Sequence, residues 1–225
     1  MAPDLIEERP EEYLKIIGLA AEHREDATTS YLAKRLGVSM PSITEMLHRL
    51  AAKGLVHYRP RDAVRLTADG QRVANSLIRR HRLWEGFLVQ FLGFSWDEVH
   101  EEAGRLEHVT SPALEERLAE FLGDLASCPH GHTIPGRREE AGTTRPLSEF
   151  GSPGAARVAR IQDETPDFLR RLDRLEIRPG CVMEVQDVSE EDGSVWVRVG
   201  GRLKEIAPDL ATSVMVEKIE NDESE

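Results

Sequence analysis

Metal-ligating and proton-accepting side chains gather in the stretch HEEAGRLEH, in which two histidines and three glutamates surround one glycine. On a helix with 3.6 residues per turn, His100, Gly104, Glu107 and His108 lie on one face. Because Glu107 and His108 are adjacent, they can share an ion only near the edge of that face, with a third ligand from another element. Glu12, in the first turn of an expected N-terminal helix, is a plausible donor. Glycine is a poor helix former, so its position in the middle of this helix needs an explanation.

Two further groups carry metal-ligating side chains. His81 and Glu85 stand four residues apart, a spacing at which both can bind one cation on a helix. Cys128 and His130 lie two apart in CPHGHTIPG, which has the composition of a loop. Each group alone is weak, because a histidine with an acid four residues away is usually a surface salt bridge and C-x-H occurs often by chance.

Catalytic motifs are missing from the sequence. Metalloproteases need H-E-x-x-H, whereas the two histidines here are separated by seven residues. The chain also lacks G-x-S-x-G, a P-loop and the Rossmann glycine pattern. We therefore expect a protein that is not an enzyme.

The composition is that of an ordinary globular protein of two domains, or three small ones: 225 residues, 40% apolar and 31% charged. Its apolar runs are short and broken by charge, which predicts no membrane span and no membrane partner. The acidic start of the chain lacks the order of a secretory signal, and two cysteines are too few for a disulfide framework. These features predict a cytoplasmic protein.

The net charge of −12 hides a basic segment. From Lys34 to Arg82 the chain has eleven Lys and Arg against three acidic residues. A basic island on an acidic chain is typical of a DNA-binding module, in which phosphate contacts supply affinity. The alternative is a solvated, arginine-rich helical surface.

The basic segment coincides with the pattern of a winged helix-turn-helix. Amphipathic stretches predict helices over residues 10–23, 28–37 and 39–54, with Ser39 as the N-cap of the third and Gly37 as the terminator of the second. LVHYRPRDAVRLT then predicts two short strands around a basic turn. Helix, tight turn, helix and basic hairpin together form the expected DNA-binding layout.

The rest of the chain divides into helices and strands. Long amphipathic patterns predict helices over 68–93, from Ser95 to Ser111, and from Ser111 onward. Their large apolar faces predict a dimer interface, or else the closing of one larger helical domain. Residues 139–155 are rich in Gly, Pro, Ser and Thr and predict a linker. Five short alternating strands follow, which suggest a small SH3-like barrel.

This order, with RHRLWEGFL, VHEEAGRLEHVTS and CPHGHTIPG between the winged pattern and the β-rich end, resembles the diphtheria toxin repressor family of metal-dependent transcription factors. The resemblance is strongest to its manganese transport regulators and covers nearly the whole chain. It implies a mainly α fold with a β-domain, in four parts: a winged helix-turn-helix (1–74), a helical metal-binding and dimerisation domain (75–138), a linker (139–155) and an SH3-like (FeoA-like) β-barrel (156–221).

The resemblance also implies two metal sites in each subunit. The primary site would use Glu12, Glu107 and His108, with a ligand normally supplied from position 104. The ancillary site would use His81, Glu85, Cys128, His130 and an acid early in the C-terminal domain, with Asp163 preferred and Glu164 next. His100 is a ligand of this second site in some members, or else supports the ligands.

The resemblance gives Gly104 a meaning, because iron-type relatives have Cys there and manganese-type relatives have Glu. With no sulfur in the primary site, the remaining ligands suit a hard ion, so Mn²⁺ is favoured and Fe²⁺ is the alternative. Water, the carbonyl of Gly104 or a nearby acid such as Glu11 or Glu101 would complete the coordination. The competing hypothesis is a primary site that is weak or rebuilt.

The expected function is a metal-dependent repressor of metal-uptake genes, acting as a homodimer on a palindromic operator in double-stranded DNA. The exposed start of the recognition helix would contact bases through Ser39, Pro41, Ser42, Thr44 and Glu45. The wing would hold phosphates through Arg59, Arg61 and Arg65. The alternative is a winged-helix DNA-binding or scaffold protein that ignores metal and whose His and Glu clusters are structural.

Overall fold

The computed structural model describes residues 10–137, 142–151, 153–189 and 191–219. The chain divides into two compact units, the first ending at Arg80 and the second beginning at His81. The boundary falls inside the long helix α5 (Ala68–Leu92). Among the described residues, no helix is both long and apolar enough to cross a membrane.

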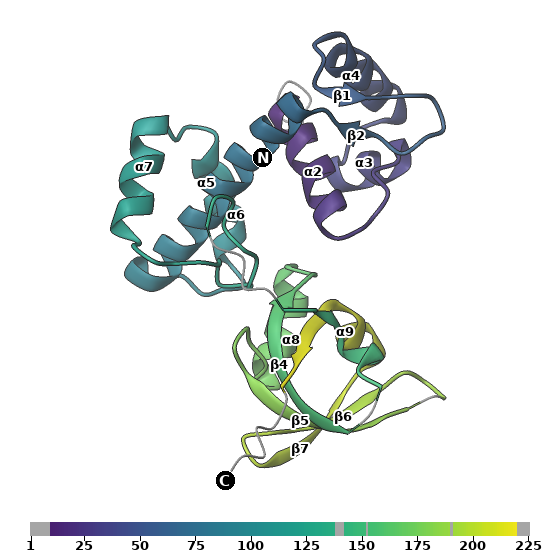
Figure 1. Cartoon of the computed structure of the whole chain (residues 1–225), viewed down its shortest axis with the longest axis vertical. Helices are drawn as coiled ribbons and strands as arrows, with labels where there is room; N and C mark the ends of the chain where they lie inside the picture. The colour runs from purple at the N-terminus through teal and green to yellow at the C-terminus, as the bar shows by residue number, and fades with distance from the viewer. Residues whose placement is uncertain (1–9, 138–141, 152, 190, 220–225) are drawn as a thin grey trace. The chain divides into compact units, whose positions relative to one another are not determined.

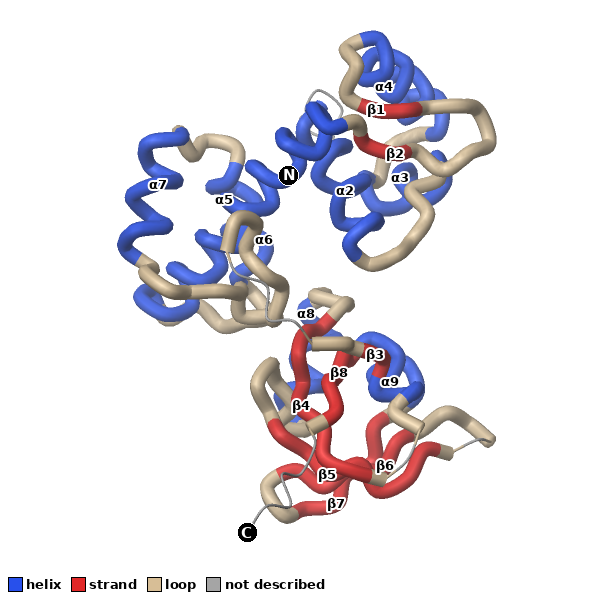
Figure 2. The backbone as a smooth tube through the Cα atoms, in the orientation of Figure 1, coloured by secondary structure: helices blue, strands red, loops and turns tan. Residues whose placement is uncertain are grey.

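The first unit has the predicted helix-turn-helix and wing (Figure 1). Its elements are α2 (Pro10–Glu22), α3 (Thr29–Leu36), α4 (Met40–Ala52), β1 (Val56–His57) and β2 (Arg65–Leu66), followed by the start of α5. β1 and β2 pair antiparallel, with Val56 opposite Leu66, and the loop between them forms the wing (Figure 2).

Local caps fix the turn between α3 and α4. The Thr28 hydroxyl accepts a hydrogen bond from the amide of Tyr31, and the Ser39 hydroxyl accepts one from the amide of Ser42. Gly37 ends α3 at φ 68°, a left-handed conformation that glycine adopts without steric cost. The core lies on the inner faces of the three helices and includes Tyr13, Leu14, Ile17, Leu32, Ile43, Leu47 and Leu50. The expected helix ends at Gly37 and Ser39 are thus confirmed.

The helical part of the second unit consists of the end of α5, α6 (Val99–Glu107) and α7 (Pro112–Phe121). α7 begins as predicted, because the Ser111 hydroxyl accepts a hydrogen bond from the amide of Leu114. The prediction that Ser95 starts the preceding helix is wrong: α6 begins at Val99, and the residues before it form a turn closed by the Glu98 amide and the Ser95 carbonyl. The side chain of Trp96 is buried in the hydrophobic core of the C-terminal part. Residues 95–98 therefore leave the axis of α6.

The C-terminal part is a six-stranded antiparallel sheet in the order β3-β8-β4-β5-β6-β7. The strands are β3 (Arg145–Pro146), β4 (Gly154–Ile161), β5 (Val182–Val188), β6 (Val195–Val199), β7 (Arg202–Ile206) and β8 (Val214–Lys218). All five predicted strands are present. The order leaves β3 and β7 as edges, so in the described residues the sheet curls without the pairing that would close the expected barrel.

Three short elements in this part were not expected from the sequence. They are the 3₁₀ turn η1 (Leu147–Glu149) and the helices α8 (Pro166–Arg174) and α9 (Pro208–Ser213). Residues 145–150 fall in the segment expected to be a linker, yet β3 pairs with β8, and Leu147 and Phe150 are buried in the sheet's core. Burial of these two side chains gives the segment a fixed place despite its turn-forming composition.

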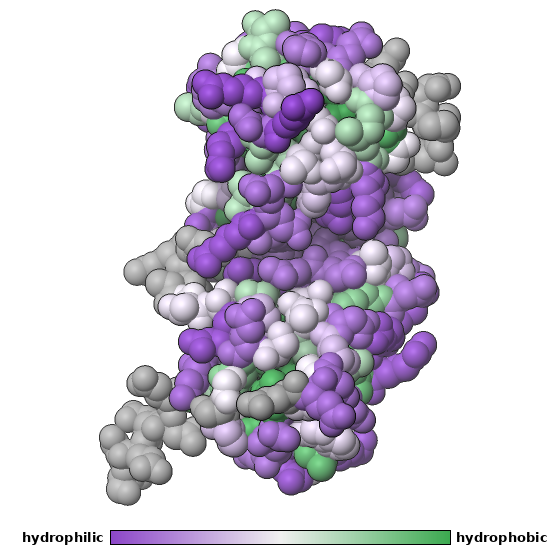
Figure 3. All heavy atoms as spheres, turned by 90° about the vertical axis from the view of Figure 1, so that its right-hand side faces the viewer, coloured by the Kyte–Doolittle hydropathy of each residue, from purple (hydrophilic) through white to green (hydrophobic). Residues whose placement is uncertain are grey.

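On the face drawn in Figure 3, hydrophilic side chains predominate and hydrophobic ones form only small areas. This agrees with cores that are enclosed within each unit. Inside the second unit, the helical part and the sheet share Trp96, whose indole belongs to the sheet's core and is 4% exposed. The guanidinium carbon of Arg178 lies 5.1 Å from the centroid of that indole, and Arg170 bonds the neighbouring Asp97.

Replacing Trp96 by alanine is expected to lower the free energy of unfolding of the second unit by about 3–5 kcal/mol, because the change empties a large part of a buried core. Trp196, 37% exposed on β6, is the matched control, and its replacement by alanine is expected to cost about 0.5 kcal/mol or less. Urea unfolding of the two variants measures the difference. Equal losses would contradict the role assigned to Trp96.

Candidate metal centre

Four separate segments of the second unit bring metal-ligating side chains together. α5 supplies His81 and Glu85, and α6 supplies His100. The loop after α7 supplies Cys128 and His130, and the short connection between β4 and α8 supplies Glu164. Two triads meet the distance requirement for sharing an ion, one formed by His81, Glu85 and His100 and the other by Glu85, Cys128 and His130. Glu85 belongs to both.

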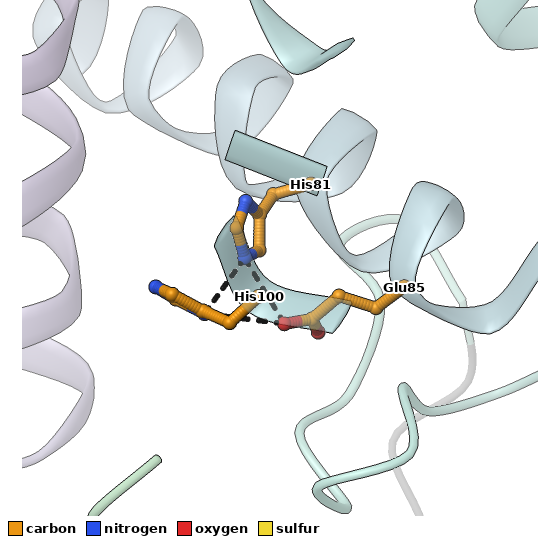
Figure 4. Close-up of side chains that lie close together, drawn as sticks. All are labelled: His81, Glu85 and His100. Atoms are coloured by element: carbon orange, nitrogen blue, oxygen red, sulfur yellow. Dashed lines mark hydrogen bonds and ion pairs between the residues drawn. The ribbon is translucent and has the colours of Figure 1, made fainter. Parts of the chain in front are cut away.

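The contacts of His81 fix which of its nitrogens faces the cluster. Its Nδ1 lies 2.5 Å from Oε2 of Glu107. Because a carboxylate accepts hydrogen bonds, Nδ1 carries the proton and donates to Glu107. Its Nε2 lies 3.0 Å from Oε1 of Glu85 and 3.1 Å from Nδ1 of His100 (Figure 4). A carboxylate behind a histidine ligand orients the ring and keeps the opposite lone pair free. His81 is therefore arranged to bind a cation through Nε2.

His130 is oriented in the same way by the main chain. Its Nε2 donates a hydrogen bond of 2.7 Å to the carbonyl of Trp96, so Nδ1 is the nitrogen that can bind a cation once it has given up its proton. That Nδ1 lies 3.4 Å from Oε1 of Glu85 and 4.0 Å from Sγ of Cys128. Two ligands of one ion that stand about 2.1 Å from it are separated by roughly 3.0–3.4 Å. The nitrogen and oxygen spacings fit such a site, and the sulfur needs only a small movement.

Of the two acids expected from the C-terminal part, Glu164 lies beside the cluster and Asp163 does not, although the sequence favoured Asp163. Oε2 of Glu164 lies 3.0 Å from Nδ1 of His100, and Oε1 lies 3.8 Å from Nδ1 of His130. The Asp163 side chain instead accepts a hydrogen bond of 2.9 Å from the amide of Thr165, in a local turn before α8. Aspartate commonly closes such turns on the amide two residues ahead.

His132 is a member of this group that sequence reasoning missed. It is buried, and its Nε2 lies 3.1 Å from Oε1 of Glu164 and 2.8 Å from the carbonyl of Ile161. The signal was present in the sequence, because His132 stands two residues after His130 in CPHGHTIPG.

Gly131, between these two histidines, holds the loop directly against β4. It has φ 89°, and a Cβ atom at this position would lie 2.1 Å from the carbonyl oxygen of Ala159. Such a contact is far closer than atoms can approach, so only glycine permits it. The amide of Ile161 in turn bonds the carbonyl of His130. The loop is thus fixed to the strand through its main chain.

Charges inside the cluster offset the cost of burial. Burial by itself raises the pKa of the Glu85 carboxyl, but attraction to His81 and His130 and hydrogen bonds from His100 and His130 hold that pKa well below its usual range. Burial lowers the pKa of His100, whereas its bonds to Glu164 and Glu85 outweigh burial and raise the pKa to about 9. The same balance, led by Glu85, raises the pKa of His130 to about 12. Burial raises the pKa of the Cys128 thiol to about 11.

The second set of predicted ligands has members in both units. In the second unit, Oε1 of Glu107 lies 3.3 Å from Nε2 of His108, and both side chains are nearly enclosed. Gly104, one turn earlier on α6, has open space where a Cβ would be. In the first unit, Glu12 stands in the first turn of α2 with the ammonium group of Lys15 3.7 Å away. The use of Glu12, Gly104, Glu107 and His108 as one primary site stays a prediction.

The predicted DNA-contacting residues lie on the surface of the first unit. Pro41 and Glu45 on α4 are exposed, and so are Arg59, Arg61 and Arg65 of the wing. Ser42 and Thr44 are half-buried. The Ser39 hydroxyl is bonded to the amide and hydroxyl of Ser42, so capping is its structural role.

Metal binding is expected to release protons and to weaken as the pH falls. With pKa values of about 9 and 12, His100 and His130 carry protons at pH 7, and an ion needs their lone pairs. Because the pKa of His100 is raised above its ordinary 6.5, its charge stabilises the metal-free fold fully below that value and this stabilisation disappears as the pH rises through about 9. Calorimetric titration with Mn²⁺ in buffers of different ionisation enthalpy measures the protons released. Affinity that is independent of pH and of buffer would contradict the expectation.

Three family models match the chain in succession. They describe the N-terminal DNA-binding domain of iron-dependent repressors over residues 5–64, the metal-binding and dimerisation domain of the same repressors over 67–136, and the FeoA domain over 145–218. Together these matches run along nearly the whole chain.

Known proteins agree with these models. The diphtheria toxin repressor of Corynebacterium glutamicum is 31% identical over 219 residues, covering 93% of this chain and 96% of the relative. The iron-dependent repressor IdeR of Mycobacterium tuberculosis is 31% identical with the same coverage. A solved manganese-dependent transcriptional repressor in complex with manganese superimposes with a TM-score of 0.87 at 35% identity, covering 94% of this chain and 100% of the other. The manganese regulator SloR gives a TM-score of 0.79 at 30% identity over 94% of this chain and 99% of its own.

With its order of domains, its buried His, Glu and Cys cluster and relatives that match over almost its full length, the chain belongs to the diphtheria toxin repressor family of metal-dependent transcriptional repressors.

Proposed function

We propose that this protein is a repressor of metal-uptake genes that binds its operator when loaded with Mn²⁺, with Fe²⁺ as the alternative ion. One observation carries the proposal: side chains from α5, α6 and the 128–130 loop converge on one buried carboxylate, Glu85, and Glu164 from the connection before α8 lies beside two of the same histidines. A buried charge surrounded by groups that can give up protons is a site prepared for a cation.

Two metal sites per subunit follow from the chemistry of the donors. The ancillary site takes His81, Glu85, Cys128, His130 and Glu164, with His100 as a further donor at 3.0 Å from Glu164. The primary site takes Glu107 and His108 with Glu12 from the first unit. Its oxygen and imidazole donors suit Mn²⁺, since sulfur is confined to the ancillary site. The open space at Gly104 leaves room for water to complete the coordination.

Glu107 links the two proposed sites. Its Oε2 accepts a hydrogen bond from His81, a ligand of the ancillary site, while its Oε1 faces His108 in the primary site. When one site binds its ion, the position of the Glu107 carboxylate becomes fixed. The ligand that this carboxylate orients in the other site then becomes fixed as well. We therefore infer that the two sites fill cooperatively.

Metal dependence of DNA binding arises if the loaded and unloaded proteins hold their two units differently. When bound, the cation supplies positive charge between carboxylates that repel each other. Glu12 on α2 and Glu107 on α6 then hold elements of separate units in one arrangement. Because ligands shift an equilibrium only by their differential affinity, the arrangement with Glu12 engaged must be the one that fits DNA.

The proposed DNA-binding surface is the exposed start of α4 and the wing. Residues on α4 read bases in the major groove, namely Pro41, Ser42, Thr44 and Glu45, while Ser39 caps the helix. Arg59, Arg61 and Arg65 hold phosphates. The operator is a palindrome with half-sites about one helical turn, roughly 10 bp, or a multiple apart, because the repressor is a two-fold dimer.

An exposed aromatic cluster on α5 and α7 of the second unit is the proposed dimer interface. Phe91 and Phe121 are 51% and 60% exposed, and their ring centroids are 4.8 Å apart. Phe87 packs against both, with centroid distances of 5.6 and 5.8 Å. Exposed aromatic clusters of this kind mark protein interfaces.

The double change Phe91→Glu with Phe121→Glu is expected to convert the dimer into a monomer, because it places charges at the centre of an apolar interface. Sedimentation velocity measures the state of assembly. Leu203→Glu, at an exposed apolar position on β7, is the matched control and should remain dimeric. A dimer that survives the double change would show that the interface lies elsewhere.

The metal requirement is tested with gel shifts on the promoter region of the protein's own gene, with Mn²⁺ and with chelator. The wild-type protein is expected to bind about 5- to 150-fold more tightly with Mn²⁺, the range of typical coupling between sites. Glu107→Ala is expected to lose this difference. Glu102→Ala, on the same helix with its carboxylate paired to Arg105, is the control and should behave as the wild type. Equal binding in chelator by the wild type would instead support a metal-independent winged-helix protein.

A further inference from the structure

The loop that carries Cys128 and His130 is hydrogen-bonded to one residue of β4, Ile161, through both the amide and the carbonyl of that residue. The amide of Ile161 donates a hydrogen bond of 2.9 Å to the carbonyl of His130, and the carbonyl of Ile161 lies 2.8 Å from Nε2 of His132. The loop itself is closed by the Cys128 amide, which bonds the carbonyl of His132 at 3.0 Å. His132 therefore has a fixed place between the loop and the strand.

The contacts of His132 determine what its Nε2 can do. A main-chain carbonyl only accepts hydrogen bonds. Nε2 must therefore carry a proton and donate a hydrogen bond to the carbonyl of Ile161. The same nitrogen lies 3.1 Å from Oε1 of Glu164, within the distance at which its N–H can be shared with that carboxylate. A ring nitrogen that holds a proton has no lone pair for a metal. Nε2 of His132 is thus not a metal ligand.

We propose that His132 is a positioning residue of the ancillary metal site, which holds the Glu164 carboxylate in place by donating a hydrogen bond to it. The inference rests on the proposed function, in which this cluster binds a divalent cation. His132 ties the contribution of the C-terminal part, Glu164, to the loop that supplies Cys128 and His130.

The other contacts of Glu164 explain why such support matters. Its other ion-pair partners among the described residues are His100 and His130, at 3.0 and 3.8 Å, and both would offer Nδ1 to the same cation. Their lone pairs turn to the ion when it binds, so neither histidine can go on holding Glu164. His132 keeps its proton in both states. It can orient the carboxylate before the cation arrives and after, which lowers the cost of ordering it.

The test compares three variants of the full-length protein for Co²⁺ binding, followed by the near-ultraviolet thiolate band from Cys128. His132→Leu keeps most of the volume and removes the donor. It is expected to weaken ancillary-site affinity by about 10- to 100-fold, as changes behind metal ligands do. His132→Gln retains an N–H near the position of Nε2 and is expected to restore affinity to within about threefold of the wild type. Glu164→Ala is expected to lose at least as much as His132→Leu.

A double-mutant cycle separates positioning from a general loss of structure. In the Glu164→Ala background, His132→Leu is expected to cause no further loss of affinity, because His132 acts through that carboxylate. Additive losses would overturn the proposal, and so would wild-type affinity in His132→Leu. Thermal unfolding in chelator reports the structural effect alone.

The wild-type protein provides a second measurement in case His132→Leu does not fold. Loaded with ¹¹³Cd²⁺ and labelled with ¹⁵N, it is expected to show cadmium–nitrogen coupling to ligand histidines such as His81 and His130, and none to His132. The Nε2 of His132 is expected to stay protonated with and without metal. Coupling to His132, or loss of its Nε2 proton, would overturn the proposal.

Failure of the inference differs from failure of the proposed function. If Cys128→Ala and Glu85→Ala leave metal binding unchanged, the cluster is not a metal site and the proposed function fails at this point. If those variants abolish ancillary binding and His132→Leu does not weaken it, only the role of His132 is wrong.

Discussion

A single oxygen atom, Oε1 of Glu85, organises the metal-binding part of this repressor. Three imidazole nitrogens approach it at 3.0, 3.3 and 3.4 Å, from His81, His100 and His130. A carboxylate taken out of water costs several kcal/mol unless charge and hydrogen bonds compensate for it. The three histidines come from α5, α6 and the loop after α7, so the compensation exists only when all three segments are folded together. Without metal, protons on His100 and His130 supply positive charge, and a bound cation would replace them.

Competition between protons and a cation for the same carboxylates leaves the packing around the cluster largely unchanged. His130 stays bonded to the carbonyl of Trp96 and His81 to Glu107 in either state, because those bonds use the nitrogens that point away from the cluster. These two histidines are therefore oriented by groups that lie outside the ancillary site. Movement associated with metal binding is then expected at the less enclosed members, His100 and Glu164, and at the boundary between the two units.

Features set by neighbouring residues could be predicted from the sequence. Ser39, Ser111 and Gly37 mark helix ends because their side chains or backbone act within three or four residues, and the wing and the five strands follow from local patterns. The pairs His81 with Glu85 and Cys128 with His130 were recognisable from spacing and from the family resemblance. Features set by distant contacts were missed. Burial of Trp96 moves the start of α6, and burial of Leu147 orders an apparent linker. The choice of Glu164 over Asp163 depends on the path of the chain after β4, which no local pattern specifies.

The contact at Gly131 has a consequence for how this architecture can change over time. Two of the ancillary donors, Cys128 and His130, lie on a loop that fits against β4 only because Gly131 has no side chain, since a Cβ there would collide with the main chain at Ala159. The strand contacts the loop through its backbone groups. Its side chains can therefore change during evolution, whereas the path of its backbone cannot. A C-terminal domain transferred from a distant relative would fit this loop only if its backbone followed the same path. Percentage identity does not report that property.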